Sequence, residues 1–261
     1  MEFEIEIKRG ESTSIESITF PDSWDGLSTK QWRAAIGLKT ILQEYGYIPG
    51  KICELLASLS NNHQMARLLF VEMNESVLIG IAEGIEWLSE LPVHDESYYK
   101  GGILMRGPQR SMKDFRMKQF GLAQQFIQVY GQQDASETQR LKALRGLWSV
   151  TWRISFLPWT AWMCDVYLFF SKIVSNKTLA LNLYNVWGMV QALKDRYPWV
   201  YDYTDDQEGP DHGFRSLLES LAGEKFGDYY QVQKAMLHDV MVHMDHNAHR
   251  VQKAKKDNKT T

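Results

Sequence analysis

Hydrophobic residues recur at two different spacings along this chain, and the first spacing is that of a strand. Residues 2–8 alternate apolar and acidic positions, which is typical of a half-buried strand. A second apolar run over 15–20 ends before Pro21, so the sequence predicts a returning strand. We therefore expect a small N-terminal β-hairpin. Because a two-stranded hairpin is marginal alone, it must pack on the helices or on another chain.

The spacing then becomes helical, so we expect a mainly α fold, a multi-helix domain that carries this hairpin. Ser28 and Gln31 have the form of a capping box, with Leu27 placed to contact Trp32, and a helix should run from Thr29 to Tyr45. Another helix should begin at Ser111 and end before a break at 131–136. The remaining helices are predicted over 52–59, 65–73, 75–91, 136–156, 159–174, 178–196, 214–223 and 228–254.

Two polar segments interrupt the helical pattern. Residues 92–102 form a polar loop that we take as the internal boundary, and residues 204–213 combine acids, Pro and Gly in a second loop. The predicted parts are a β-hairpin arm (1–22), an N-terminal helical part (23–92), a C-terminal helical part (103–254) and a basic flexible tail (255–261).

Composition narrows the classes of function. The 261 residues are 44% hydrophobic, enough to build a core, and the net charge of -3 gives no global case for binding nucleic acid or an acidic membrane. The local exception is the basic end from Arg250 to Lys259, which we interpret as a solvated terminus. The alternative, an adaptor for nucleic acid, requires salt-sensitive binding that is lost on deleting 250–261.

The cysteines and the apolar runs indicate a protein of the reducing cytoplasm without a membrane span. Cys53 and Cys164 are far apart in apolar surroundings, which argues against a disulfide and against a cysteine zinc site. The uncharged run 154–164 is far shorter than the roughly 20 residues of a membrane-spanning helix.

The pattern that comes nearest to chemistry is rich in His and Asp. Asp239, His243 and His246 are spaced so that they share a helix face and could hold a divalent metal. This face lies opposite the apolar stripe, so a solvated polar face is the interpretation we favour. A metal-dependent enzyme or metal-stabilised domain remains the alternative. The sequence contains no HExxH, phosphate-binding Gly loop or GxSxG pattern, and we expect no enzyme activity and no cofactor.

Two stretches resemble small helical tail-assembly or tail-accessory proteins of tailed phages and prophages. They are FPDSWDGLSTKQW at 20–32 and GFRSLLESLAGEKFGDYYQV at 213–232. The resemblance implies a non-enzymatic protein-binding role in tail morphogenesis, as an assembly chaperone or accessory protein. It also implies a partner among tail tube or tape-measure subunits, a cytoplasmic location in the host and an open question about retention in the virion. A homo-oligomer is compatible with it.

Aromatic residues supply the interface candidates under this interpretation. Four tryptophans cluster between 148 and 162, and such a concentration fills a core more often than it forms an interface. Where they do meet a partner, they and an adjacent tyrosine pair are the anchors that we expect. The candidates are Trp148, Trp152, Trp159, Trp162, Tyr229 and Tyr230.

Overall fold

The computed structural model is mainly helical, as the sequence predicts. Contacts divide the chain into unit 1, Met1–His94, and unit 2, Asp95–Thr261. This division falls within the polar loop 92–102. The predicted loop at 204–213 and most of the predicted helix at 214–223 lie outside the described residues. The structure describes residues 2–9, 12–40, 49–98, 105–155, 157, 159–198, 200, 221–222 and 226–259.

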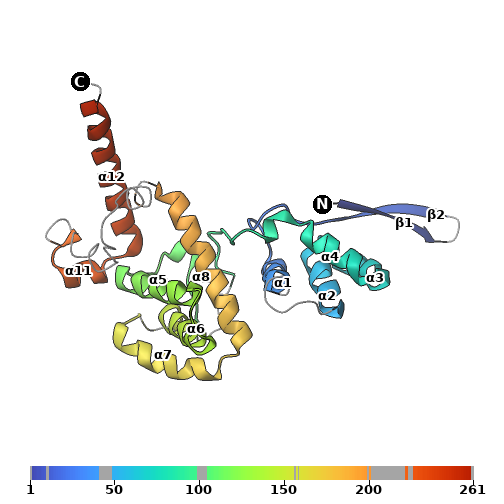
Figure 1. Ribbon diagram of the computed structural model, residues 1–261, viewed down its shortest axis with the longest axis horizontal. Coiled ribbons are helices and arrows are strands. Elements are labelled where there is room, and N and C mark those ends of the chain that lie inside the picture. Colours follow the sequence, from blue (N-terminus) through green and yellow to red (C-terminus); the bar gives the residue numbers. More distant parts are fainter. Residues whose placement is uncertain are drawn as a thin grey trace. The chain divides into compact units, whose positions relative to one another are not determined.

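Unit 1 begins with two antiparallel strands, β1 (Glu2–Arg9) and β2 (Ser12–Thr19), paired so that Phe3 lies opposite Ile18 (Figure 1). Burial is confined to the end of β2 among the side chains that the structure describes. Ile18 is fully buried, whereas Ile15 is 71% exposed. Ile15 and Ile18 lie on opposite faces of β2, and the face of Ile18 is buried at the point where the strand meets the helices.

Reciprocal hydrogen bonds attach β2 to the helical part of unit 1. The Thr19 amide donates to Asn61 Oδ1 over 2.9 Å, and the Asn61 amide donates to the Thr19 carbonyl over 3.0 Å. Phe20 then stacks on Phe70 with ring centroids 6.2 Å apart. These contacts fix the point at which the strand pair ends and the helical part begins.

Among its described residues, unit 1 also contains four helices and one 3-10 turn. The expected capping box is present: the Gln31 amide donates to Ser28 Oγ over 3.2 Å, and the Ser28 amide donates to Gln31 Oε1 over 3.0 Å. The predicted helix 75–91 is too long, because the observed helix ends at Glu83 and a separate 3-10 turn follows over Glu86–Leu88. The elements are α1 (Thr29–Thr40), α2 (Pro49–Leu59), α3 (His63–Glu72), α4 (Glu75–Glu83) and η2 (Glu86–Leu88).

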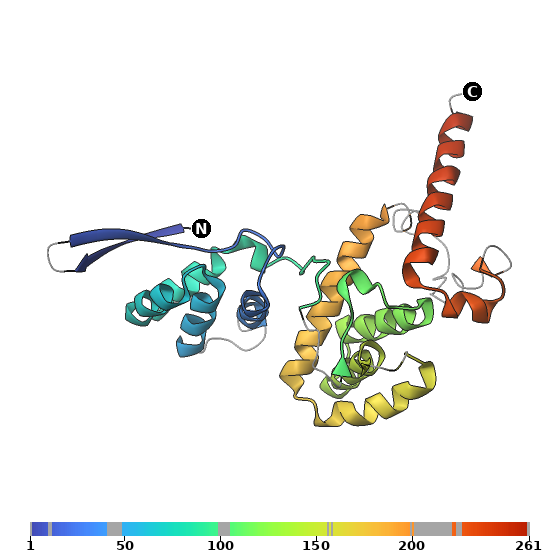
Figure 2. The ribbon, with the colours of Figure 1, turned by 180° about the vertical axis from the view of Figure 1, so that it is seen from behind.

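Unit 2 is a helical body with a short two-stranded sheet in the middle of the chain. In that sheet Met105 pairs with Ile154 and Arg106 with Arg153. Figures 1 and 2 show α5, α6 and α7 gathered beside the long helix α8. The elements are β3 (Met105–Arg106), η3 (Arg110–Met112), α5 (Met117–Gly131), α6 (Glu137–Thr151), β4 (Arg153–Ile154), η4 (Ala161–Met163), α7 (Cys164–Phe170), η5 (Ser171–Ile173), α8 (Asn176–Arg196), α11 (Tyr229–Lys234) and α12 (Leu237–Lys259).

Two predicted helices of unit 2 differ from the observed ones for the same reason. The helix expected from Ser111 begins at Met117, and the helix expected over 228–254 is interrupted between α11 and α12. At both places the backbone pairs with a distant segment. The Met117 amide donates to the Ala235 carbonyl over 3.0 Å, and the Leu237 amide donates to the Phe115 carbonyl over 2.9 Å.

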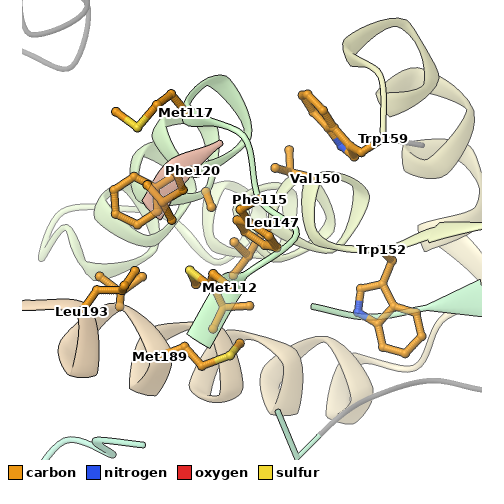
Figure 3. Close-up of a cluster of buried hydrophobic side chains, with 14 of the residues drawn as sticks. Met112, Phe115, Met117, Phe120, Leu147, Val150, Trp152, Trp159, Met189 and Leu193 are labelled. Carbon is orange, nitrogen blue, oxygen red and sulfur yellow. The ribbon is translucent and has the colours of Figure 1, made fainter. Parts of the chain in front are cut away.

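The core of unit 2 collects side chains from nearly all of these elements. Met189 and Leu193 of α8 lie beside Met112 and Phe120, and Trp152 and Trp159 close the other end of the cluster (Figure 3). Because one contiguous cluster includes residues from η3 to α12, the described residues of unit 2 share one hydrophobic core.

A backbone turn at Ser111 and Met112 enters this core in an unusual conformation. Both residues have a φ of +54°, a region that residues with a Cβ seldom adopt. His238 of α12 holds the turn: its Nε2 lies 2.6 Å from the Ser111 carbonyl oxygen, and its Nδ1 lies 2.8 Å from the Tyr197 hydroxyl. Since a carbonyl only accepts, Nε2 carries the proton and Nδ1 accepts from Tyr197.

Replacing His238 by Leu should therefore destabilise unit 2. The substitution removes two hydrogen bonds and leaves their buried partners unsatisfied, so we expect a loss of about 2 kcal/mol in the free energy of unfolding. Urea unfolding followed by tryptophan fluorescence measures it. His246→Leu, at an exposed position of the same helix, is the control and should change stability by less than about 0.5 kcal/mol. Equal stability of the two variants would contradict the bridging role of His238.

Candidate functional site

The tryptophan cluster that the sequence offers as an interface is divided between core and surface. Trp148, Trp152 and Trp159 are buried, whereas Trp162 is 72% exposed. Trp148 and Trp152 stack with centroids 5.5 Å apart, and the Trp152 indole N–H donates to Asn182 Oδ1 over 2.9 Å. The three buried rings are thus structural, and only Trp162 is placed to meet a partner.

The tyrosine pair is divided in the same way. Tyr229 is partly buried against the core of unit 2, and Tyr230 is 70% exposed. Their rings meet edge to face with centroids 5.7 Å apart. Tyr230 therefore remains an accessible aromatic candidate, and its ring packs against the partly buried ring of Tyr229.

Trp162 belongs to a larger apolar surface formed by the helical segment 161–173, which comprises η4, α7 and η5. At about 100° per residue, one side of this segment carries Met163, Tyr167 and Ser171, all of them buried. A second side carries the exposed Asp165 and Lys172. The third side is both exposed and apolar, which is unusual for a helix whose core-facing side is already satisfied.

We call this third side the α7 stripe. Its residues recur at intervals of three and four and fall within an arc of about 100°. Phe169 is 66% exposed and Ile173 is 84% exposed, so the stripe is in water along its length. The Phe169 and Phe170 rings meet edge to face with centroids 6.0 Å apart. The stripe consists of Trp162, Val166, Phe169, Phe170 and Ile173.

The charge beside the stripe comes from its polar neighbours. Lys172 Nζ lies 5.6 Å from the centroid of the Phe169 ring, within range of a cation–π contact. Asp165 lies on the same charged side as Lys172, nearer to the start of the segment. The α7 stripe is thus an apolar strip with a charged margin, which is the usual anatomy of a protein interface.

Sequence reasoning found Trp162 but missed Val166, Phe169, Phe170 and Ile173. The signal was present, because apolar residues in 162–173 occur on more than one side of the helix. A helix that is apolar on two sides has a second surface to cover besides the one that faces its own core.

The His and Asp pattern of α12 does not assemble a three-ligand site. Asp239 and His246 are exposed, and the ring of His243 meets Phe226 edge to face at 5.4 Å. His243 Nε2 lies 3.0 Å from Asn247 Nδ2. Within the part of the chain that the structure describes, no three His, Cys, Asp or Glu side chains are grouped so that they could hold a metal ion.

The cysteine at the start of α7 is held in its neutral form. Burial raises the pKa of the Cys164 thiol to about 11, and the neighbouring Asp165 carboxylate adds to the increase. Burial likewise raises the pKa of the Cys53 thiol. A thiol is a nucleophile only as the thiolate, so neither side chain is activated for covalent catalysis.

Comparison with known proteins adds no relative. No protein-family model, no curated protein and no solved structure matches the chain. Among the described residues, no helix is long and apolar enough to cross a membrane.

The neutral state of Cys164 predicts slow alkylation of the native protein. With its pKa near 11, the thiolate fraction at pH 8 is roughly a hundredfold below that of an unperturbed thiol, and the rate should fall accordingly. Mass spectrometry after iodoacetamide treatment, with and without urea, measures both rates, and Cys53→Ser isolates the signal of Cys164. Reaction of the native protein at the unfolded rate would show that Cys164 is an accessible thiolate.

Proposed function

We propose that this protein is a non-enzymatic binding protein of phage tail morphogenesis, an assembly chaperone or accessory protein that holds a tail tube or tape-measure subunit. The observation that supports a binding role is the exposed α7 stripe. The resemblance at 20–32 and 213–232 directs that role to tail assembly. The stripe is a feature of the structure, whereas the resemblance is a feature of the sequence.

The energetics of the α7 stripe favour a protein partner. Apolar area removed from water contributes roughly 25 cal/mol per Å², and large aromatic side chains are the usual centres of binding energy. Three of the five stripe residues are aromatic, and they stand on a helix whose other apolar side is anchored in the core. The stripe is therefore pre-organised, and a partner that covers it does not have to order it first.

A complementary partner would present an apolar helix face or groove of similar length. The spacing of three and four along the stripe matches the ridges of a second helix. A chaperone needs such a surface, because it must cover apolar positions of a subunit until that subunit meets its own neighbours. This requirement connects the geometry of α7 with the assembly role.

The test is co-expression of the tagged chain with tail tube and tape-measure subunits, followed by affinity capture and mass spectrometry. Phe169→Ser combined with Ile173→Ser should reduce capture by at least about tenfold, because two exposed anchors are lost. The melting temperature should not fall, since both side chains are exposed. Leu68→Ser combined with Val71→Ser is the matched control, comparably exposed on α3, and should capture normally.

Two results would overturn the proposal. One is that the wild-type chain captures neither tail subunit, and the other is that the stripe variant captures as well as the wild type. Sedimentation of the purified chain tests whether the stripe binds a second copy of the chain instead. A dimer that becomes a monomer on Phe169→Ser would assign the stripe to contact between two copies of this chain.

A further inference from the structure

Unit 1 contains a groove of about 450 Å³. Two segments form its walls, one running from Phe20 to Asp25 and the other from Gly84 to Trp87. Glu90, Leu91 and Val93 complete the lining. All of these residues belong to unit 1, so the groove is formed by one compact part of the chain.

Two tryptophans join the walls of the groove. The rings of Trp24 and Trp87 meet edge to face with centroids 4.9 Å apart. Each indole N–H donates to a carbonyl of the opposite segment: Trp24 Nε1 to Trp87 over 3.0 Å, and Trp87 Nε1 to Pro21 over 2.8 Å. Trp24 is 4% and Trp87 is 8% exposed, so the two rings are buried beneath the groove and fix its shape before any ligand arrives.

A buried lysine fixes the remaining edge. Lys39 Nζ donates to the carbonyls of Leu88, Ser89 and Glu90 over 2.8, 2.9 and 2.8 Å. Burial lowers the pKa of Lys39, while the Glu90 carboxylate raises it. Because all three N–H groups of the ammonium donate to these carbonyls, Lys39 fixes the backbone that leads into Glu90 and Leu91.

The ionisable side chains that line the groove all have the same sign. They are Asp22, Asp25, Glu86 and Glu90, each exposed to solvent, and no Lys, Arg or His is among the lining residues. A concave surface lined by one sign of charge focuses the field and attracts the opposite charge. The groove thus combines two exposed apolar residues, Leu91 and Val93, with acidic margins.

We propose that this groove binds a basic segment of a partner protein, one that carries Arg or Lys beside apolar residues. The methylenes of such a side chain would lie on the exposed Leu91 and Val93, while its cation meets the carboxylates. An inorganic cation would use only the carboxylates and leave Leu91 and Val93 in water. The inference does not depend on the α7 stripe or on the proposed function.

The test uses the full chain and a fluorescein-labelled peptide of alternating Arg and Leu, with fluorescence anisotropy as the readout. Glu86→Gln combined with Glu90→Gln should weaken binding by about tenfold. Glu72→Gln combined with Glu83→Gln is the matched control: it changes the net charge equally, at exposed positions of unit 1 outside the groove. It should leave the Kd within about twofold of the wild type.

A second variant tests the apolar wall. Leu91→Ala, at an exposed lining residue, should weaken the Arg and Leu peptide about threefold while a peptide of alternating Arg and Ser binds weakly to every variant. Three results would overturn the proposal: no binding of the Arg and Leu peptide, equal weakening by both pairs of Glu→Gln changes, or equal affinity for the two peptides. The last two would mean attraction to the overall charge rather than occupation of the groove.

Discussion

The turn at Ser111 and Met112 determines how the segments of unit 2 come together. A residue with a Cβ at positive φ costs about 1–3 kcal/mol, so two in succession persist only where surrounding contacts specify them. Here the Ser111 amide donates to the Asp95 carbonyl over 2.7 Å, His238 bonds the Ser111 carbonyl, and Met112 is fully buried. The start of unit 2, the end of α8 and the start of α12 therefore meet at one place.

The α7 stripe can be exposed because the other side of the same helical segment is firmly held. Tyr167 is fully buried, and its hydroxyl accepts from the Ile154 amide over 3.2 Å, next to the β3–β4 pair. Trp152 and Trp159 fill the adjoining core. The tryptophans near this segment thus have opposite roles: the buried ones support the helix, and Trp162 is presented by it.

What the sequence could predict was local. The capping box of Ser28 and Gln31, and the Ser136 cap of α6, each involve groups within three residues, so their geometry follows from the sequence alone. The break before Leu237 could not be predicted, because it arises from backbone bonds to Phe115, more than a hundred residues away in the chain. The side of a helix that Trp162 would occupy also depended on distant contacts, although the two-sided apolar pattern of 162–173 carried the information.

The three hydrogen bonds of Lys39 restrict which side chains this position can accept. Three carbonyl oxygens converge on a single nitrogen, and only an ammonium group presents three donors from one atom. A guanidinium spreads its donors over a planar fork, so arginine would keep the charge and lose the geometry. Acetylation would leave one donor and add bulk where the side chain is 3% exposed. Arg and acetyl-lysine, the usual replacements for a surface lysine, are therefore both incompatible with this buried one.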